Sequence, residues 1–418
     1  MKVWILQTGE PLQIDGENVR PMRAINLSNM LIRYGHDVTI WSSDFYHQKK
    51  THRYNTKTDI KVSDKLTIRL IPSCGYKHNI SIARLIDHVQ LSRNLKNYLK
   101  QYRELPDVAF IGYPPIETSF VFTNWLKRRG VPTLLDVKDQ WPDIFVDALP
   151  KPIRPFGQII FYPYFYMARK IMKEVTGISS MADGFLNWAL KNVNRKKTVN
   201  DKVFPLTTKS RNINKIELEI ARKWWDENGI LNNGTPRVFF VGSVSRAFDF
   251  EPIFEAARYY LFNNMKCEFV ICGEGELTSV LKKKANGLSN IFFAGWINRP
   301  QIEALAERSI ASLAPYLNIA NFITNIPNKI IDSLSLGIPI LCPLKGEVEN
   351  LIKTYKVGLQ YSNKRGKSLF DCINTLIINS KLQNEISINS RKLYEKHFSF
   401  EKVYISLVKH LEMMAHAY

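Results

Sequence analysis

The sequence predicts an α/β protein of two doubly wound domains, and three observations carry this prediction. Short apolar runs alternate with amphipathic segments over the first 200 residues, the alternation restarts near residue 237, and a polar stretch at 191–233 separates the two series. Such alternation of strands and helices favours parallel sheets. The chain has 418 residues, of which 45% are hydrophobic and 23% are charged. This composition is typical of globular proteins and excludes disordered and fibrous classes.

In the first series, five apolar runs have the length of buried strands. These runs are 3–6, 38–41, 66–71, 108–111 and 133–137. Amphipathic patterns predict helices over Arg23–Tyr34 and Ile82–Tyr102. The connection Thr8–Arg23 is longer than an ordinary turn of about 2–6 residues, so we expect a functional loop there. It lacks the G-x-G-x-x-G spacing, which weighs against a dinucleotide site.

The second series has the same character. Its predicted strands are 237–241, 268–272, 290–293, 312–315 and 338–342, and its predicted helices include 251–263 and 301–307. A last amphipathic segment, 401–415, is expected to pack back on the first domain. We therefore place one domain at 1–205, a second at 206–395 and a C-terminal helix at 396–418. Ligands of such sheets bind beyond the carboxyl ends of the strands.

The net charge of +20 is concentrated in the first half of the chain. Residues 1–200 carry 30 basic and 17 acidic side chains, which is +13 of the total. A basic surface can serve nucleic acid, anionic lipid or a polyphosphate ligand, and charge alone does not choose among them. No zinc-finger pattern, RNP-like aromatic motif or recognition helix supports nucleic acid.

The segment 151–173 is the candidate for membrane contact. It carries five basic residues, no acidic ones and an aromatic run between Phe156 and Tyr166. Basic residues that bracket an apolar stripe suit a helix lying in an anionic membrane surface, and a core helix packed on the sheet is the alternative. No stretch approaches the ~18 apolar residues of a spanning helix, and the N-terminal apolar run is too short for a signal peptide. We therefore expect peripheral contact.

The cysteines are scattered and form no C-x-x-C pair. They are Cys74, Cys267, Cys272, Cys342 and Cys372. This usage predicts reduced, buried thiols in a cytosolic protein rather than a disulfide framework or a zinc site.

Glycine-rich turns follow several strands of the second series. Gly242 ends the run Phe239-Phe-Val-Gly and would let backbone approach a ligand, and Arg246 could pair with a diphosphate. The segments 270–275 and 291–297 also place glycines after strands. A plain turn with a solvated arginine is the alternative for each turn alone, so their order along the chain is the informative feature.

The segment 324–340 holds the sharpest pattern. Pro327 suits the first turn of a helix, whose free N–H groups at Asn328 and Lys329 would face an anion. Asp332 lies one turn further in. Such an arrangement would hold a phosphate and a hydroxyl-rich group together, and an ordinary amphipathic helix with a proline start is the alternative.

In this order the segments resemble the GT-B glycosyltransferases of the family 4 type, which move a sugar from a nucleotide-sugar donor. The resemblance spans most of the chain and implies two Rossmann-like domains facing each other across a cleft. It is carried by Phe240-Val-Gly242, Cys272-Gly-Glu-Gly275, Phe293-Ala-Gly-Trp-Ile297, Leu313-Ala-Pro315, Pro327-Asn-Lys-Ile-Ile-Asp332, Gly337-Ile-Pro339, Gly346-Glu347 and Asp136-Val-Lys-Asp-Gln-Trp-Pro142. The Pro-Asn-Lys subgroup looks common among transferases that build bacterial surface polysaccharides.

The resemblance also implies a donor-binding set. Arg246 and Lys329 would neutralise the diphosphate, and the backbone around Ile297 would hold the base. The family's Glu-x7-Glu element falls on Thr324 and Asp332, so a hydroxyl replaces its first carboxylate. The full expected set is Gly16, Gly242, Arg246, Glu274, Ile297, Thr324, Asn328, Lys329, Asp332 and Glu347.

A departing nucleoside diphosphate builds negative charge on phosphate, which cations and helix-terminal N–H groups would stabilise. No D-x-D motif is present, so we expect metal independence and no cofactor beyond the nucleotide-sugar co-substrate. The acceptor hydroxyl needs a proton acceptor on the first-domain side. The resemblance places a catalytic Asp139 there, with a helix N-cap or a partner for Lys138 as its structural alternatives. Arg20, His47 and Lys138 are the expected acceptor-binding residues.

The expected function is a hexosyl- or N-acetylhexosaminyltransferase that moves a sugar from a UDP-sugar to a polyprenyl-diphosphate-linked saccharide. The resemblance implies retention, peripheral association with the inner face of the bacterial cytoplasmic membrane, and a role in O-antigen, capsule or exopolysaccharide assembly. Two alternatives stay open. One is a sugar-nucleotide 2-epimerase, which shares the two-domain architecture. The other is a non-catalytic partner of a related transferase, because Thr324 replaces a carboxylate.

Overall fold

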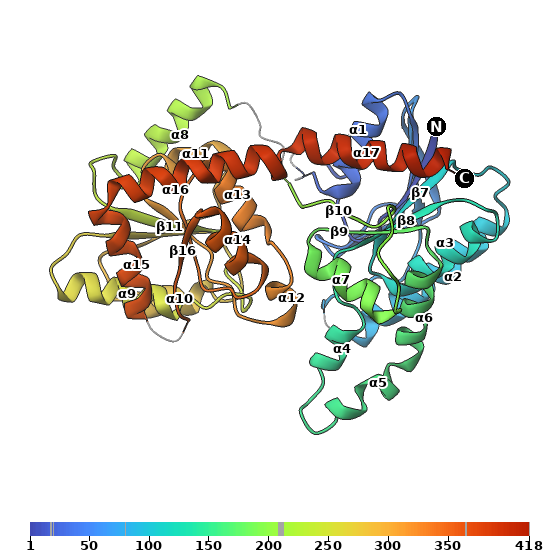
Figure 1. The fold of residues 1–418 in the computed structure, drawn as a ribbon, viewed down its shortest axis with the longest axis horizontal. Helices are drawn as coiled ribbons and strands as arrows, with labels where there is room; N and C mark the ends of the chain where they lie inside the picture. Colours follow the sequence, from blue (N-terminus) through green and yellow to red (C-terminus); the bar gives the residue numbers. More distant parts are fainter. Residues whose placement is uncertain (17–18, 20, 80, 208–212, 364–365, 418) are drawn as a thin grey trace. The chain divides into compact units, whose positions relative to one another are not determined.

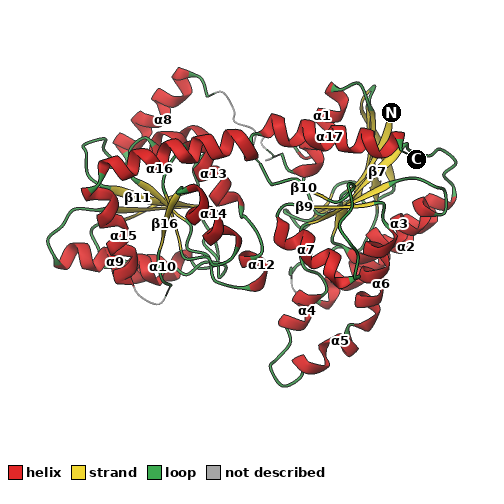
Figure 2. Ribbon diagram, viewed as in Figure 1, coloured by secondary structure: helices red, strands yellow, loops and turns green. Residues whose placement is uncertain are grey.

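The computed structural model describes residues 1–16, 19, 21–79, 81–207, 213–363 and 366–417. The chain divides into two compact units (Figures 1 and 2). Unit 1 comprises Met1–Pro205 with Glu401–Tyr418, and unit 2 comprises Leu206–Phe400. Each unit has a largely parallel sheet flanked by helices, so the predicted α/β class with two doubly wound parts is confirmed.

Unit 1 is built on an eight-stranded sheet in the order β10-β9-β8-β7-β1-β2-β6-β5. Neighbouring strands are parallel except β5, which runs antiparallel to β6. Val3 of β1 lies opposite Val38 of β2 and Val108 of β7, so these central strands end at one edge. The bounds are β1 Lys2–Leu6, β2 Asp37–Ser43, β5 Thr58–Ser63, β6 Leu66–Ile71, β7 Val108–Tyr113, β8 Thr133–Val137, β9 Gly177–Ser180 and β10 Lys202–Val203; β3 Phe45–Tyr46 pairs with β4 Thr51–His52.

Three helices of unit 1, α2, α3 and α6, pack side by side against one face of its sheet. Their buried side chains Leu95, Phe122 and Ile171 join Trp4 and Trp41 of the strands in one apolar core. The helices are α1 Arg23–Arg33, α2 Ile82–Lys100, α3 Ile116–Lys127, α4 Asp143–Asp147, α5 Gly157–Ile160, α6 Tyr162–Glu174, α7 Asp183–Asn192 and α17 Phe400–His416.

The C-terminal helix, α17, clusters with unit 1 from Glu401 onward. Its His410 ring nitrogen Nε2 lies 3.1 Å from the carbonyl oxygen of Asn200, and Glu412 Oε1 lies 2.8 Å from His36 Nε2. These contacts join the end of the chain to the elements of its first 205 residues.

Unit 2 carries a six-stranded parallel sheet in the order β13-β12-β11-β14-β15-β16. Its strands are β11 Arg237–Val241, β12 Glu268–Cys272, β13 Ile291–Gly295, β14 Ala311–Leu313, β15 Ile340–Cys342 and β16 Gly358–Gln360. Its helices are α8 Lys215–Glu227, α9 Glu251–Phe262, α10 Thr278–Lys284, α11 Arg299–Ala306, α12 Ala320–Ile323, α13 Asn328–Leu336, α14 Glu347–Tyr355, α15 Gly366–Ile378 and α16 Ser380–Leu393.

The polar stretch 191–233, predicted to lie between the two series, contains the division between the units after Pro205 and also two elements of its own. Lys202–Val203 add the edge strand β10 to the first sheet, and Lys215–Glu227 form α8. The Asn214 side chain caps α8 by accepting the Glu217 N–H at 2.7 Å. Only Ala221 and Trp225 of this helix are buried. Because most of α8 faces solvent, its sequence is mainly polar and resembles that of a linker.

The segment 151–173 has one buried and one exposed side. Phe165, Ala168, Ile171 and Met172 of α6 pack in the core, as the alternative of a core helix expects. Five other apolar side chains keep 51–75% of their surface exposed; they are Phe156, Ile159, Ile160, Tyr162 and Tyr166. The aromatic run therefore supplies both a core contact and an apolar outer surface.

Within the described parts of the chain, no helix is long and apolar enough to cross a membrane. All five cysteines are free. Cys267, Cys272 and Cys342 are buried as predicted, but Cys372 is half-buried and Cys74 is exposed. The prediction fails for Cys74 because it lies in the loop after β6 rather than in a strand.

Candidate active site

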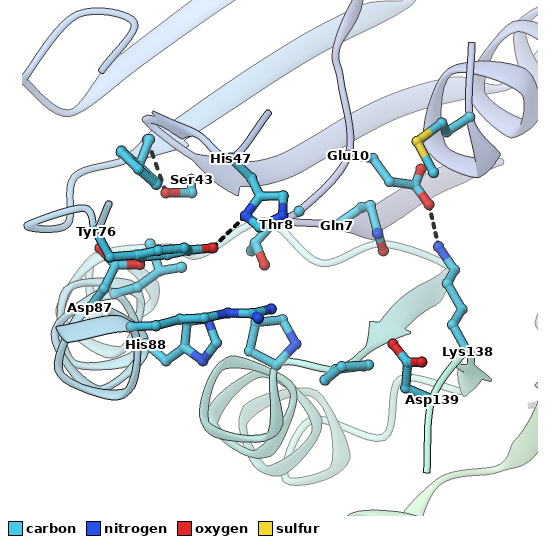
Figure 3. Close-up of a pocket in the computed structure, with 17 residues that line it drawn as sticks. Gln7, Thr8, Glu10, Ser43, His47, Tyr76, Asp87, His88, Lys138 and Asp139 are labelled. Atoms are coloured by element: carbon cyan, nitrogen blue, oxygen red, sulfur yellow. Dashed lines mark hydrogen bonds and ion pairs between the residues drawn. The ribbon is translucent and has the colours of Figure 1, made fainter. Parts of the chain in front are cut away.

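A cavity of about 210 Å³ opens in unit 1 beyond the carboxyl ends of its central strands (Figure 3). Its walls come from the segments that follow β1, β2, β7 and β8 and from one side of α2. The walls mix carboxylates, histidines, aromatic rings and the cations Arg84 and Lys138. Such a lining suits a ligand that is rich in hydroxyl groups and carries negative charge.

The predicted catalytic residue Asp139 lies in the wall of this cavity together with Lys138. Both follow Val137, where β8 ends, so the sheet itself places them at the ligand-binding edge. The Lys138 ammonium forms an ion pair with Glu10, which Figure 3 shows across the cavity from Asp139. Glu10 in turn accepts the N–H of Ala24 at 2.8 Å. Lys138 is thereby held in place by a carboxylate that the sequence did not single out.

His47, a predicted acceptor-binding residue, also lines the cavity. Its Nδ1 lies 2.5 Å from the Tyr76 hydroxyl and 3.2 Å from Lys50 Nζ. Burial, and after it the charges of Lys50 and Arg84, lower the pKa of His47 to about 4. The imidazole is therefore neutral at physiological pH and can accept or donate a hydrogen bond.

A second histidine of the cavity wall, His88, was not predicted from the sequence. It is 3% exposed, and its ring lies 5.8 Å from that of Trp141. Its Nδ1 has no hydrogen-bond partner among the described residues and lies 3.8 Å from Glu117 Oε2. Burial, then Arg84 and His47, lowers the pKa of His88 to about 3, and burial raises the pKa of Glu117 to about 7. Because the imidazole is neutral, this pair is not an ion pair at neutral pH.

A signal for His88 does exist in the sequence. The buried face of helix α2 includes the polar residues Asp87, His88 and Ser92 beside Leu91 and Leu95. Polar side chains at core positions of an amphipathic helix indicate either a satisfied network or a site. Glu117 belongs to α3 and meets His88 through the packing of α3 on α2, which no spacing reveals.

Asp136, which lies on β8 itself, has a structural role. It is fully buried, its Oδ2 lies 3.3 Å from Arg23 Nε, and its Oδ1 accepts the Ser179 hydroxyl at 2.9 Å. Arg23 also donates to the carbonyl of Phe204 at 2.6 Å. This buried network joins β8, β9, α1 and Phe204, and Asp136 Oδ2 also lies 4.0 Å from Lys138 Nζ.

In unit 2, the side chain of Lys329 of α13 reaches the turn that follows β11. Its ammonium donates to the carbonyl of Val241 and lies 4.4 Å from the centre of the Phe240 ring. Gly242 next to it has φ +150°, and a Cβ there would overlap the Lys329 ammonium. Only glycine therefore allows this cation to approach the turn. The structure brings together Gly242 and Lys329, two residues of the expected donor set.

Helices α13 and α14 begin at the same edge of this sheet. Pro327 is the N-cap of α13, with Asn328 exposed at its first turn and Asp332 half-buried one turn on. Glu347 starts α14 after Gly346. The Thr324 hydroxyl donates to the Ala320 carbonyl at 2.8 Å, at the end of α12. The N-terminal turn of α13 thus lies where the sequence predicts an anion.

The remaining expected donor residues are more dispersed. Arg246 is exposed, and its Nε lies 3.8 Å from Glu276 Oε2. Ile297 is 6% exposed in the core beside Phe239, and Glu274 is exposed after β12. Gly16 belongs to unit 1, where it follows a short 3-10 turn.

The expected acceptor-binding residue Arg20 lies outside the described residues. Among those described, no group of three or more His, Cys, Asp or Glu side chains is arranged to hold a metal ion.

Two Rossmann-like units, each with a largely parallel sheet flanked by helices, define a GT-B fold, the fold that the sequence predicted. Residues 222–393, which lie in unit 2, match the family described as glycosyl transferases group 1. The fold and this match support a glycosyltransferase. No curated protein matches the chain.

Several solved structures are similar to the chain at 10–13% identity. Sucrose-phosphate synthase from Thermosynechococcus elongatus matches with a TM-score of 0.72 and 13% identity over 100% of both chains. HepE from Anabaena, solved with UDP-glucose, matches with a TM-score of 0.65 and 12% identity over 99% of this chain and 100% of its own. WaaG, described as a glycosyltransferase of lipopolysaccharide biosynthesis, matches with a TM-score of 0.65 and 13% identity over 98% and 99%.

Proposed function

We propose that this glycosyltransferase moves a hexosyl or N-acetylhexosaminyl group from a UDP-sugar to a polyprenyl-diphosphate-linked saccharide, without a metal ion and with retention of configuration. The observation that carries the donor half is the Lys329 ammonium held at the Gly242 turn beside the first turn of α13. A cation beside the N-terminus of a helix is an arrangement that suits a diphosphate.

The chemistry of the donor follows from the leaving group. As the bond between the anomeric carbon and the diphosphate oxygen breaks, negative charge grows on phosphate. Lys329 and the N-terminus of α13 would stabilise that charge without reorganisation, because they are already in place. The half-buried Asp332 and Glu347 are assigned to hydroxyl groups of the sugar or ribose.

The acceptor half rests on the cavity of unit 1. Asp139 is assigned to the acceptor hydroxyl, as proton acceptor or orienting partner, and Lys138 and His47 to further acceptor groups. The neutral His47 and His88 can hydrogen-bond sugar hydroxyls in either direction. Arg84 adds positive charge for an anionic part of the acceptor.

Uridine as the donor base is supported by HepE, which was solved with UDP and UDP-glucose. The lipid-linked acceptor is supported by the exposed apolar side chains of 156–166 beside basic residues, which suit a membrane surface. We therefore assign the protein to the cytoplasmic side of a bacterial membrane, in the assembly of O-antigen, capsule or exopolysaccharide. The lipopolysaccharide role given for WaaG is consistent with this assignment.

The test is release of nucleoside diphosphate by the purified chain across UDP-, GDP- and TDP-sugars, with and without bacterial lipid extract. Release that needs one donor and the lipid supports the proposal and names the donor. Conversion of a UDP-sugar to its 2-epimer without an acceptor would replace the proposal by an epimerase. No turnover of any donor by a folded chain that binds UDP would favour a non-catalytic partner.

A further inference from the structure

A second cavity, of about 430 Å³, lies in unit 2 between α11, the end of α13 and α16. Figure 1 shows these three helices on one side of the unit 2 sheet. The segments that precede β14 and β15 complete its lining, so the cavity lies at the amino ends of these strands, whereas the Gly242 turn follows the carboxyl end of β11. Its volume is within the range of about 300–1,000 Å³ that is usual for small-molecule sites.

Most charged side chains of this cavity are paired. Arg299 Nε donates to Glu303 Oε1 at 3.0 Å, so these two charges offset each other. Glu307 accepts two hydrogen bonds from Arg222, at 2.8 and 2.9 Å, which offset its charge. The guanidinium of Arg391 forms neither a hydrogen bond nor an ion pair with any residue that the structure describes. The lining therefore offers many polar groups but only a small net charge.

Arg391 lies against the backbone of Gly337, where α13 ends. Gly337 has φ +66°, and a Cβ there would lie 2.3 Å from Arg391 Nε and 2.8 Å from its Cζ. Glycine therefore allows both the left-handed turn and the close approach of the arginine. A cation at the carboxyl end of a helix is stabilised by the partial negative charge there. The guanidinium is thus positioned before any ligand arrives, and its N–H groups remain available.

Three serine hydroxyls of the cavity have already donated their hydrogen atoms. Ser309 and Ser335 each donate to the backbone carbonyl of a preceding residue at 2.7 Å, and Ser387 donates to the Gly337 carbonyl. Each serine oxygen can still accept a hydrogen bond but has no hydrogen left to donate. The amide of Gln383, one turn before Ser387 on α16, can do both.

This lining discriminates among ligands by charge. A phosphate group carries negative charge and accepts hydrogen bonds, so it would face the Glu303 carboxylate and serine oxygens that cannot donate. It would also face the carboxyl ends of α11 and α13, which carry partial negative charge. An amine would meet the guanidinium groups of Arg299 and Arg391 instead. The hydroxyl groups of a neutral polyol both donate and accept, so they satisfy both kinds of lining group.

We infer that this cavity is a binding site for a neutral saccharide, separate from the donor turn and from the cavity of unit 1. The saccharide hydroxyls accept hydrogen bonds from Arg391 and the amides of α16, and they donate to Glu303 and the serine oxygens. This site goes beyond the proposed function and does not rest on it, because none of its lining residues is assigned to the transfer reaction.

The test measures saccharide binding to the full-length protein by ligand-observed NMR, with glucose, galactose, N-acetylglucosamine, maltose and lactose as the probes. The variant Asn384→Ala/Arg391→Ala removes two exposed hydrogen-bond donors of the cavity. Because one of them is charged, binding should weaken at least about tenfold. The matched control Asn232→Ala/Arg258→Ala removes an exposed asparagine and an exposed arginine of unit 2 outside the cavity, and it should bind like the parent protein.

The variant Glu303→Gln separates a saccharide from an anion, with glucose 6-phosphate as the anionic probe. It removes a negative charge and keeps the shape of the side chain, so it should weaken binding of the neutral saccharide about threefold. An anionic ligand would instead bind this variant more tightly. Glucose 6-phosphate that binds more tightly than glucose, and more tightly still to Glu303→Gln, would overturn the inference in favour of an anion site.

Two other results would also overturn it. One is the absence of binding of every neutral probe to the folded parent protein. The other is equal binding by Asn384→Ala/Arg391→Ala and its control. If His47→Ala then lost the binding, the saccharide would belong to the cavity of unit 1 and not to unit 2.

Discussion

Replacing Glu117 with glutamine should change how the stability of unit 1 depends on pH. Glu117 is 4% exposed, and burial raises its pKa from 4.5 to about 7. Between these two values the folded chain keeps a proton that the unfolded chain has lost. Because the folded state then binds more protons, the free energy of unfolding falls as pH rises through this range and levels off above it.

The size of this effect follows from the interval between the two pKa values. From 4.5 to about 7 it amounts to roughly 3 kcal/mol, of which about 2 kcal/mol falls between pH 5.5 and 8. Glutamine cannot ionise, so the variant Glu117→Gln does not lose this stability as the pH rises. His88 stays neutral over this range because its pKa is about 3, and so it contributes equally to both proteins. From pH 5.5 to pH 8, the free energy of unfolding of the variant should therefore rise by about 2 kcal/mol relative to that of the parent protein.

The assay is urea unfolding followed by tryptophan fluorescence at pH 5.5 and at pH 8, with the parent and variant measured side by side. Only the change of their difference with pH matters, since any pH-independent effect of the new amide cancels. Glu104→Gln serves as the control, because the Glu104 side chain is 77% exposed. Parallel curves for the parent and Glu117→Gln would refute the argument that burial keeps Glu117 protonated.

Three further predictions concern the proposed active site. Lys329→Ala should weaken UDP binding at least about tenfold in calorimetry, since it removes a charge-assisted contact, while Lys283→Ala should not; equal affinity would remove Lys329 from the diphosphate site. Gly242→Ala should lower both the melting temperature and UDP affinity, because its Cβ displaces the Lys329 ammonium and φ +150° strains alanine; an unchanged variant would argue against the close approach. Asp139→Asn should spare UDP binding yet reduce transfer at least about tenfold, and unchanged turnover would exclude it from the mechanism.

The strands that were predicted with the correct bounds are those with mainly apolar sequences. β6, β8, β11 and β12 have the predicted bounds. β8, β11 and β12 are buried along almost their whole length, which leaves little choice of residue, and β6 alternates buried apolar residues with half-buried Thr67 and Arg69. β5 was missed because it is an edge strand with exposed, polar positions. β9 was missed although it is fully buried. Ser179 and Ser180 are residues typical of a loop, and only the structure shows that their hydroxyls donate to Asp136 and to the Ala182 carbonyl.

The local features of the candidate site could be predicted from the sequence, whereas its contacts between distant residues could not. The turn at Gly242 and the start of α13 were predicted because each is a local pattern with a local physical reason. The contact between Lys329 and the Val241 carbonyl, by contrast, depends on the order of strands in the sheet. His88 and Glu117 meet only because α2 packs on α3.

The surroundings of the carboxylates in unit 1 decide which one suits an acceptor hydroxyl. Asp136 is fully buried beside Arg23, and Glu10 is paired with Lys138. Asp87 is 3% exposed and accepts the Gly75 N–H at 2.6 Å. Glu117 is held protonated up to about pH 7 by burial, so it is a poor base below that pH. Asp139 lies past the end of β8 and is half-buried in the cavity wall, without the deep burial of the other four, which is why the proposal assigns it to the acceptor hydroxyl.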